Sequence, residues 1–397
     1  MKTKKILIAG GGIGGLAAAT ALLQKGFDVV VFEQAGELRE VGAGIQISPN
    51  GNRALNTLGL FRKLQALSCD ADSKEIRLWN TGRMWKLFDL GQQAMDKYGF
   101  PYMTVFRPDL LRVLAEEVRR LKLQALRLHC RVAGVRQDEH GVEIHLEDGS
   151  VEKGDVLIGA DGLHSRVRPA LHGDDPLLYT GQTVWRTLIP MERLPTHMRR
   201  KVAINWVSHQ GHVVHYPVQG GSLMNFVGTL ENQPWEGAPW SRPGSRAQCK
   251  ADFEGWHEDV HTLIDHGENF GQWALCLREF LDHWTVGRAT LLGDACHPTL
   301  PLLGQGAVSS IEDAIVLTRC LLAFERVEDA LQRYEAVRRP HTYRMVRGSS
   351  ENRSRFHHPD LAQPDTAVPF IEREWQRDAI SDRYDWLFNY DAETVAI

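Results

Sequence analysis

The chain has 397 residues, of which 43% are hydrophobic and 24% are charged, and its formal net charge is −4. This balance is typical of a globular protein that is long enough for two domains or one large one. The sequence contains no long basic run and no apolar stretch of about 18 residues, so neither nucleic acid nor a membrane is expected as a partner.

The chain begins with a strand, a glycine loop, a helix and a second strand. "KILIA" is an apolar run typical of a parallel strand covered on both faces, and we interpret it as a buried strand rather than as part of a secretion signal. It leads into G-x-G-x-x-G at Gly10, Gly12 and Gly15, with Gly14 inside the loop, and "DVVVFE" ends in Glu33. The pattern predicts a dinucleotide site, with phosphate at the helix N-terminus and Glu33 on a ribose, but it does not separate NAD from FAD.

Two later segments place an acid directly after an apolar strand. "GDVLIGADGLHSRVR" (154–168) contains Asp161, and "GRATLLGDACHPTLPLLGQGAVSSIEDAIVLTRCL" (287–321) contains Asp294, a proline-rich loop and an amphipathic helix. An ordinary NAD dehydrogenase needs neither feature. A flavin site needs both features. The ribityl hydroxyls of the flavin can donate hydrogen bonds to a carboxylate, and a helix N-terminus stabilises the negative charge on the pyrimidine edge of the reduced flavin.

With these motifs in order, the chain resembles the class A, single-component flavoprotein aromatic hydroxylases, which include salicylate hydroxylase, 3-hydroxybenzoate 6-hydroxylase and 6-hydroxynicotinate 3-monooxygenase. The resemblance extends from about residue 4 to about residue 350 and includes "GAGI" at 42–45 and "FRPDLLRVL" at 106–114. It implies an α/β fold in which a Rossmann-like FAD-binding domain of the GR2 type is interleaved with a β-sheet substrate domain and followed by C-terminal helices.

The resemblance also implies roles for cofactor-binding residues. They are Glu33 and Arg107 on the adenosine and pyrophosphate side, Asp294 on the ribityl chain, Gly304 and Gly306 beside the isoalloxazine, and Asp161 between the flavin and nicotinamide sites. From the residues alone, two alternatives stay open: Arg107 as a surface ion-pair partner and Asp161 as a turn residue.

The implied reaction uses O₂, either NADH or NADPH, and FAD that is bound tightly but not covalently. The chain has no second G-x-G-x-x-G motif, so the resemblance implies that the nicotinamide coenzyme binds without a nucleotide-binding domain of its own. A flavin C4a-hydroperoxide would hydroxylate a hydroxylated aromatic carboxylate. Salicylate, converted to catechol, is our first choice of substrate, and 3-hydroxybenzoate or 6-hydroxynicotinate is the second. Relatives that hydroxylate 3-hydroxybenzoate commonly have Gln where this chain has Pro301, and relatives that act on 6-hydroxynicotinate commonly have His where it has Leu302. A flavin oxidase or dehydrogenase that inserts no oxygen is the alternative of another class.

The predicted domains are interleaved. Residues 1–70, 100–180 and 285–320 are assigned to the FAD-binding domain, 71–99 and 181–284 to the substrate domain, and 321–397 to a C-terminal helical segment with a tail that we expect to be irregular from about residue 356. Between 180 and 233 apolar and polar residues alternate, which predicts antiparallel strands with one wet face, forming a sheet over a pocket.

The candidate catalytic residues lie in "GHVVHYPV". Residues two and four apart on a strand share a face, so His212 and Tyr216 would converge on one surface. In hydroxybenzoate-hydroxylating relatives a His and a Tyr at this spacing contact the substrate, which implies His212 as the phenol base and Tyr216 as the binder of hydroxyl or carboxylate. The alternatives are that His215 is the residue that faces the pocket, or that all three residues are ordinary sheet surface. His297 is a further candidate base, for which we favour a structural role.

An apolar wall is predicted from the proline-rich loop, consisting of Leu300, Pro301 and Leu302 together with Leu303. Trp185 and Trp206 are interpreted as core. The six cysteines are scattered without a C-x-x-C pair, which favours a reducing cytoplasm and predicts no metal site. A small aromatic acid is the expected partner, and a homodimer is left open.

Overall fold

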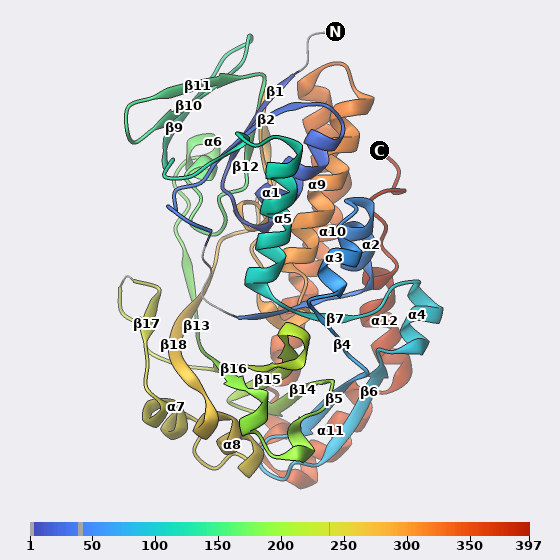
Figure 1. Ribbon diagram of the computed structural model, residues 1–397. Helices are drawn as coiled ribbons and strands as arrows, with labels where there is room; N and C mark the ends of the chain where they lie inside the picture. Colours follow the sequence, from blue (N-terminus) through green and yellow to red (C-terminus); the bar gives the residue numbers. More distant parts are fainter. Residues whose placement is uncertain (1–3, 39–42, 238) are drawn as a thin grey trace.

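The computed structural model describes residues 4–38, 43–237 and 239–397. Figure 1 shows a parallel sheet with its helices at one end of the molecule and a large sheet at the other; α9 (Gly306–Ala323) lies beside the parallel sheet, and α10 (Val327–Phe356) runs from there toward the large sheet. Among the described residues, no helix combines the length and the apolar character needed to cross a bilayer.

The predicted opening unit forms the centre of the parallel sheet. β1 (Lys5–Ala9) pairs in parallel with β2 (Asp28–Phe32) and β12 (Val156–Gly159), and α1 (Ile13–Gln24) follows the glycine loop. The apolar strands are buried on both faces. α1 packs against α9 and against α5 (Arg107–Leu121), and apolar residues of the antiparallel strands between residues 132 and 154 belong to the same core. The strand order is β19 (Thr285–Val286), β20 (Ala289–Leu291), β12, β1, β2, β8 (Leu126–Arg127).

Two small sheets flank this core. One contains β11 (Val151–Gly154), β10 (Val142–Leu146) and β9 (Val132–Gln137), and the other contains β3 (Gly44–Ile47), β7 (Met103–Phe106) and β4 (Cys69–Asp70). The short helices near them are α2 (Pro49–Thr57), α3 (Phe61–Gln65), α4 (Gln92–Tyr98) and α6 (Val167–His172).

The second large sheet has eight strands, and most neighbours in it are antiparallel. Their order is β17 (Ser241–Pro243), β18 (Glu268–Leu277), β13 (Leu178–Pro190), β16 (Leu223–Leu230), β15 (Gly211–Val218), β14 (Val202–Ser208), β5 (Ser73–Leu78) and β6 (Met84–Asp89). The antiparallel strands predicted between 180 and 233 are therefore present, but the prediction of a wet face is wrong. Residues on both faces of β14 and β15 are buried, because α7 (Arg246–Asp252) and α8 (Glu258–His266) cover one face and the other faces a cavity. The predicted domain boundaries stay a prediction.

The C-terminal segment corrects a second expectation. The tail predicted to be irregular contains α11 (Pro364–Glu374) and α12 (Arg377–Phe388). Their apolar residues, with Leu302 and Phe356, form one buried cluster behind the proline-rich loop. The proline and charge content that suggested an irregular tail is compatible with helices, because Pro364 occupies the first turn of α11. Short 3₁₀ turns span Met191–Arg193, Thr196–Met198, Gln219–Gly221, Gly293–Ala295, Pro301–Leu303 and Pro359–Ala362.

Candidate active site

The glycine loop after β1 packs tightly on one side and is open on the other. Gly10 has a φ of +102°, and a Cβ there would lie 2.3 Å from the carbonyl oxygen of Ala160. A Cβ on Gly15 would lie 2.0 Å from the Gly10 carbonyl oxygen, and one on Gly14 would meet Leu292. A Cβ on Gly12, by contrast, would meet no heavy atom within 4 Å, and Gly12 lines the cavities on either side of it. The loop therefore offers its backbone to a ligand at Gly12.

Two neighbouring cavities meet at this loop, since both are lined by Gly12, Ala160 and Gly162. The cavity toward β2 is lined by Gly10, Glu33 and Asp161 as well. The Glu33 carboxylate accepts hydrogen bonds from the backbone N–H groups of Gly11 at 2.7 Å and Ala35 at 2.8 Å. It thus braces the loop at the place predicted for a ribose.

Asp161 has the geometry of the turn residue that was its alternative. Its carboxylate accepts from the Ser165 hydroxyl at 2.6 Å and from the backbone N–H groups of Arg166 at 2.7 Å and Val167 at 3.1 Å. These contacts hold the start of α6, and Asp161 also lines the cavity. Its contact with a flavin or nicotinamide stays a prediction.

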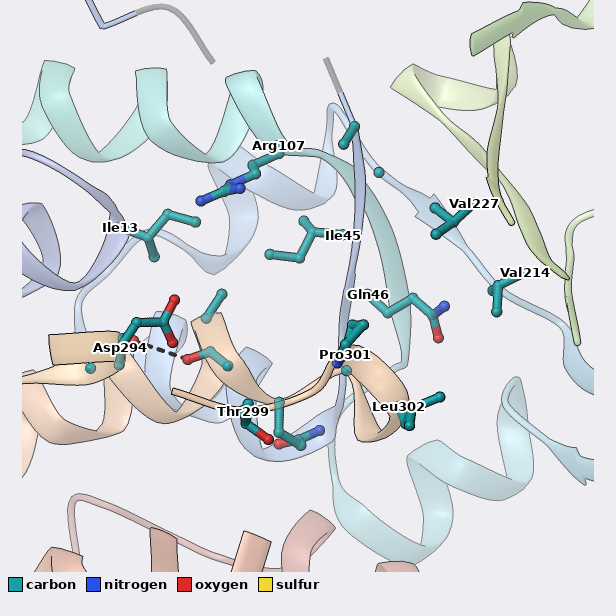
Figure 2. Close-up of a pocket in the computed structure, with 18 of the residues that line it drawn as sticks. Ile13, Ile45, Gln46, Arg107, Val214, Val227, Asp294, Thr299, Pro301 and Leu302 are labelled. Carbon is teal, nitrogen blue, oxygen red and sulfur yellow. Dashed lines mark hydrogen bonds between the residues drawn. The ribbon is translucent and has the colours of Figure 1, made fainter. Parts of the chain in front are cut away.

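The other cavity has a volume of about 330 Å³ and contains the remaining predicted cofactor residues. Arg107 begins α5, and Asp294 follows β20; both point into the same end of the cavity (Figure 2). Burial raises the pKa of Asp294, and His297 and Arg107 oppose that rise. Gly306, at the first turn of α9, lines the cavity next to Asp294, and Gly304, with φ +65°, lines it next to Gln46. An open glycine loop, a carboxylate for hydroxyls, an arginine and a helix N-terminus in one groove fit an FAD.

Gly44, at the start of β3, lies between the two halves of the site. Gly42 lies outside the described residues, but the Gly44 N–H donates to Asn225 Oδ1 of β16 at 2.7 Å. A Cβ on Gly44 would lie 2.5 Å from the Tyr216 ring, so only glycine lets this strand approach the sheet so closely.

The floor of the cavity is one face of the eight-stranded sheet, and its residues follow from the register. Val214 pairs with Asn205 on β14 and with Val227 on β16, and Val227 pairs with Arg186 on β13. Both valines face the cavity in Figure 2. His212 and Tyr216 lie on either side of this row, on the same face, and both line the cavity as predicted from their spacing. His215 faces the opposite side, where burial lowers its pKa to about 3.

Lys74 is a cavity residue that sequence analysis missed. It lies on β5, two residues from Ile76, whose partner Asn205 belongs to the valine row, so it shares the cavity face. Lys74 is only 6% exposed, and burial lowers its pKa to about 8. Within the described ranges it forms no ion pair, and its ammonium lies 5.9 Å from the centroid of the Tyr102 ring. A buried ammonium without a counterion calls for an anionic ligand.

Tyr216 is held in its phenol form. Burial raises its pKa, and its hydroxyl is hydrogen-bonded to Gln46 of β3. Gln46 also accepts a hydrogen bond from the Tyr102 hydroxyl at 2.6 Å. Tyr216 therefore suits hydrogen bonding to a ligand and does not suit the role of a base.

His212 is linked to a second histidine. Its Nδ1 lies 2.7 Å from Nε2 of His357, the residue that follows α10, and Phe356 packs edge-on against its ring. Burial lowers the pKa of His212 well below its usual range, and His357 adds to this effect. Phe356 and His357 are about 145 residues from His212 in the sequence. The periodicity of a strand relates only residues of that strand, so it could not predict this contact.

The apolar wall is smaller than predicted. Pro301 and Leu302 line the cavity, and Figure 2 shows both beside Gln46. Leu300 and Leu303 do not: they are buried in the cluster with the C-terminal helices, and the Leu300 carbonyl accepts a hydrogen bond from Ser349 at 2.6 Å. The 3₁₀ turn at Pro301–Leu303 rotates successive side chains to different sides, so not every leucine of the loop faces the ligand. Trp185 and Trp206 are core residues, as predicted.

His297 has a structural place behind the cavity. It is fully buried, and its Nε2 lies 2.6 Å from Asp313 Oδ2, while Arg338 Nε donates to the other Asp313 oxygen at 2.7 Å. Cys296 completes a group of metal-ligand type, but the guanidinium of Arg338 already supplies the cation there. The prediction of no metal site stays a prediction.

Ser309 and Ser310, for which the sequence offered no role, have separate contacts. The Ser309 hydroxyl accepts a hydrogen bond from Arg338 at 2.9 Å. Ser310 lines the cavity, and its hydroxyl donates to the Gly306 carbonyl at 2.9 Å. It packs between the two glycine motifs, because a Cβ on Gly293 or Gly14 would meet it within 3.1 Å. A serine is small enough for this position.

Comparisons with known proteins agree with this geometry. The FAD-binding-domain family model matches residues 3–349. The chain is 37% identical to a 3-amino-4-hydroxybenzoate 2-monooxygenase of Streptomyces platensis, over 98% of this chain and 97% of that protein. It is 34% identical to a 3-hydroxybenzoate 6-hydroxylase of Polaromonas naphthalenivorans, over 89% of this chain and 88% of that protein. A salicylate hydroxylase in complex with substrate superposes with a TM-score of 0.82 at 25% identity, over 98% of this chain and 96% of that one.

Proposed function

The chain belongs to the FAD-binding-domain family, and from that premise we propose that it hydroxylates a hydroxylated benzoate bound on the sheet face that carries Lys74, His212 and Tyr216. It is an FAD-dependent aromatic monooxygenase of the hydroxybenzoate hydroxylase type. NADH or NADPH is the reductant of this reaction, and O₂ supplies the inserted oxygen. When bound, FAD would supply the transfer of electrons from the nicotinamide and the activation of dioxygen.

Lys74 is the observation that carries the choice of substrate class. Its buried ammonium has no carboxylate partner in the described part of the chain, so a ligand carboxylate would supply the missing counterion. Arg186, which also lines the cavity, adds positive charge at the far side of the valine row. Val214 and Val227 between them suit the face of an aromatic ring. A small, planar aromatic acid fits this distribution of charge and apolar surface.

We assign the remaining roles from position. His212 accepts the proton of the substrate hydroxyl, because a phenolate ring is the better nucleophile toward activated oxygen. Tyr216, kept as a phenol, donates a hydrogen bond that orients the ring. Pro301 and Leu302 close the cavity above the ring and exclude water.

Among candidate substrates, 3-amino-4-hydroxybenzoate takes first place because relatives acting on it match nearly the whole chain. 3-Hydroxybenzoate follows. Salicylate, our first choice from the sequence, is favoured by the structural match, and 6-hydroxynicotinate completes the set. Screening these four acids for NADH and NADPH oxidation, with chromatography of the products, identifies the substrate. Product must be identified as well as oxidation measured, since a non-substrate ligand can stimulate nicotinamide oxidation alone.

We predict that Lys74→Met raises KM for the active acid at least about tenfold, equivalent to about 1.4 kcal/mol, because it removes the counterion and leaves the volume of the side chain nearly unchanged. The matching carboxamide should be a poor substrate of the wild type, and Lys74→Met should not weaken its binding. Steady-state kinetics on the acid and amide pair measures both.

Lys86→Met is the matched control, because Lys86 lies on the neighbouring strand β6 with a 55% exposed side chain. It should behave as the wild type. Equal KM values for the acid in Lys74→Met and wild type would contradict the role of Lys74 as carboxylate anchor.

A further inference from the structure

A chain of three ionisable side chains leads away from the cavity. His212 Nδ1 contacts His357 Nε2 at 2.7 Å, and His357 Nδ1 is hydrogen-bonded to Glu231 Oε1. The three residues come from β15, the end of α10 and the end of β16. Their contacts join the cavity face of the sheet to the C-terminal helices.

The carboxylate at the end of the chain is firmly held. Arg353 Nε donates to Glu231 Oε1 at 2.8 Å, and Gln182 Nε2 donates to the same oxygen at 2.7 Å. Tyr179 on β13 is the other titratable group that interacts with Glu231. Exposure increases along the chain, from 4% for the His357 side chain to 12% for Glu231 and 34% for Arg353. The chain therefore reaches toward solvent.

The charge of Glu231 determines where the protons lie. Burial favours its neutral form, but hydrogen bonds from His357 and Arg353 outweigh burial and lower the pKa of Glu231 to about 2. A carboxylate only accepts hydrogen bonds, so His357 Nδ1 must carry a proton. When His357 is neutral, its Nε2 is an acceptor, and His212 Nδ1 must then be the donor. Neutral His212 consequently has a lone pair on Nε2, the ring nitrogen available to the cavity.

We propose that His357 and Glu231 act as positioning residues that fix the tautomer of His212 and receive, through it, the proton of the substrate hydroxyl. The O–H bond of the substrate breaks and a new N–H bond forms at His212 Nε2. The N–H bond at His212 Nδ1 breaks, and its proton binds His357 Nε2. The substrate has lost one proton and become a phenolate, His212 has changed tautomer, and His357 has become an imidazolium beside the Glu231 carboxylate.

This arrangement answers a difficulty in the proposed function, on which it rests. His212 is a weak base in its buried setting, and the Glu231 carboxylate is hydrogen-bonded to His357 and not to His212, so an imidazolium at His212 would lie on the cavity face without a carboxylate in contact with it. Moving the positive charge to His357 places it against a carboxylate instead. The phenolate then forms without an unpaired cation on the cavity face.

The test compares His357→Gln and Glu231→Gln in the FAD-bound enzyme with the acid found active in the screen. His357→Gln should lower kcat at neutral pH by about 10- to 100-fold, the range of a general base, with KM changed less than about threefold. Glu231→Gln should lower kcat about tenfold and move the acid limb of the kcat profile to lower pH by about one unit. The sign follows because the Glu231 carboxylate is hydrogen-bonded to His357 and stabilises an imidazolium there, and its removal makes that protonated form less favourable.

His358→Gln is the matched control, since His358 is adjacent to His357, stacks on Phe370 and is 39% exposed. It should leave kcat and the acid limb unchanged. The double variant His212→Gln with His357→Gln should be no slower than His212→Gln alone, because the two histidines act in series. A wild-type kcat and an unshifted acid limb in both single variants would overturn the relay. The proposed function would still stand in that case, because it depends on the activity of the wild-type enzyme in the screen.

A measurement on the wild-type protein tests the relay even if the variants fail to fold. With ¹⁵N-labelled histidine and FAD bound, 4-hydroxy-3-nitrobenzoate added in its phenol form, at a pH below its phenol pKa, should become the coloured phenolate on the enzyme. The released proton should bind His212 Nε2, and the proton of His212 Nδ1 should pass to His357 Nε2, which becomes an imidazolium. A neutral His357 beside the bound phenolate would overturn the proposal.

Discussion

At the scale of single residues, the site depends on two buried basic groups with opposite surroundings. Lys74 lies in the cavity and has no counterion in the described part of the chain. His357 lies behind the cavity, and the Glu231 carboxylate is its counterion. Sequence periodicity placed His212 and Tyr216 correctly on one face. It missed Lys74, because a lysine in the alternating strand "SKEIRL" is typical of a solvent-exposed position. Burial of Lys74 depends on which strand pairs with β5, and this is a tertiary property.

The pH dependence of ligand binding tests Lys74 at the same scale. Burial lowers its pKa to about 8 in the free protein, and a bound carboxylate raises it. Affinity for an acid should thus be full below about pH 8 and weaken as the pH rises above that value, by up to about tenfold per unit. Titration with benzoate, which has no phenol to ionise, measures the dissociation constant. A constant value to about pH 10, or the same loss in Lys74→Met, would contradict this account.

At the scale of elements, the C-terminal helices are part of the site. They cover the back of the 3₁₀ turn at Pro301–Leu303, and the residue that precedes His357 closes the cavity. The sequence predicted a C-terminal helical segment that begins at residue 321, and α10 lies within it. It did not predict α11 and α12, because α11 contains two prolines and both helices are stabilised by tertiary packing of their apolar residues.

We predict that Phe388→Ala on α12 lowers the free energy of unfolding by about 3 kcal/mol, the usual cost of deleting a buried ring. Phe388 is 3% exposed and packs edge-on against Tyr98 and Tyr102. Denaturant unfolding of the FAD-bound protein measures the change, and Leu322→Ala, at a 52% exposed position, is the control. If the two variants lost equally little stability, α12 would be a loosely attached tail.

At the scale of the whole molecule, the chain brings three distant strand ends to one groove. The glycine loop, the Asp161 turn and the Asp294 turn are adjacent because β1, β12 and β20 are neighbours in one parallel sheet. Local motifs with fixed chemistry made this part of the site predictable. The substrate end of the site was less predictable from the sequence. Leu300 and Leu302 are the same residue type, and only the 3₁₀ turn decides which of the two faces the cavity. His357 comes from the end of a helix that is distant in the sequence.

The central claim is that this groove inserts one atom of dioxygen into a hydroxylated benzoate. Turnover of the acid found in the screen under ¹⁸O₂, with mass spectrometry of the aromatic product, tests it most directly. The account predicts one ¹⁸O atom in each hydroxylated product molecule. An oxidised aromatic product that carries no ¹⁸O would contradict it and identify the protein as a flavin oxidase or dehydrogenase.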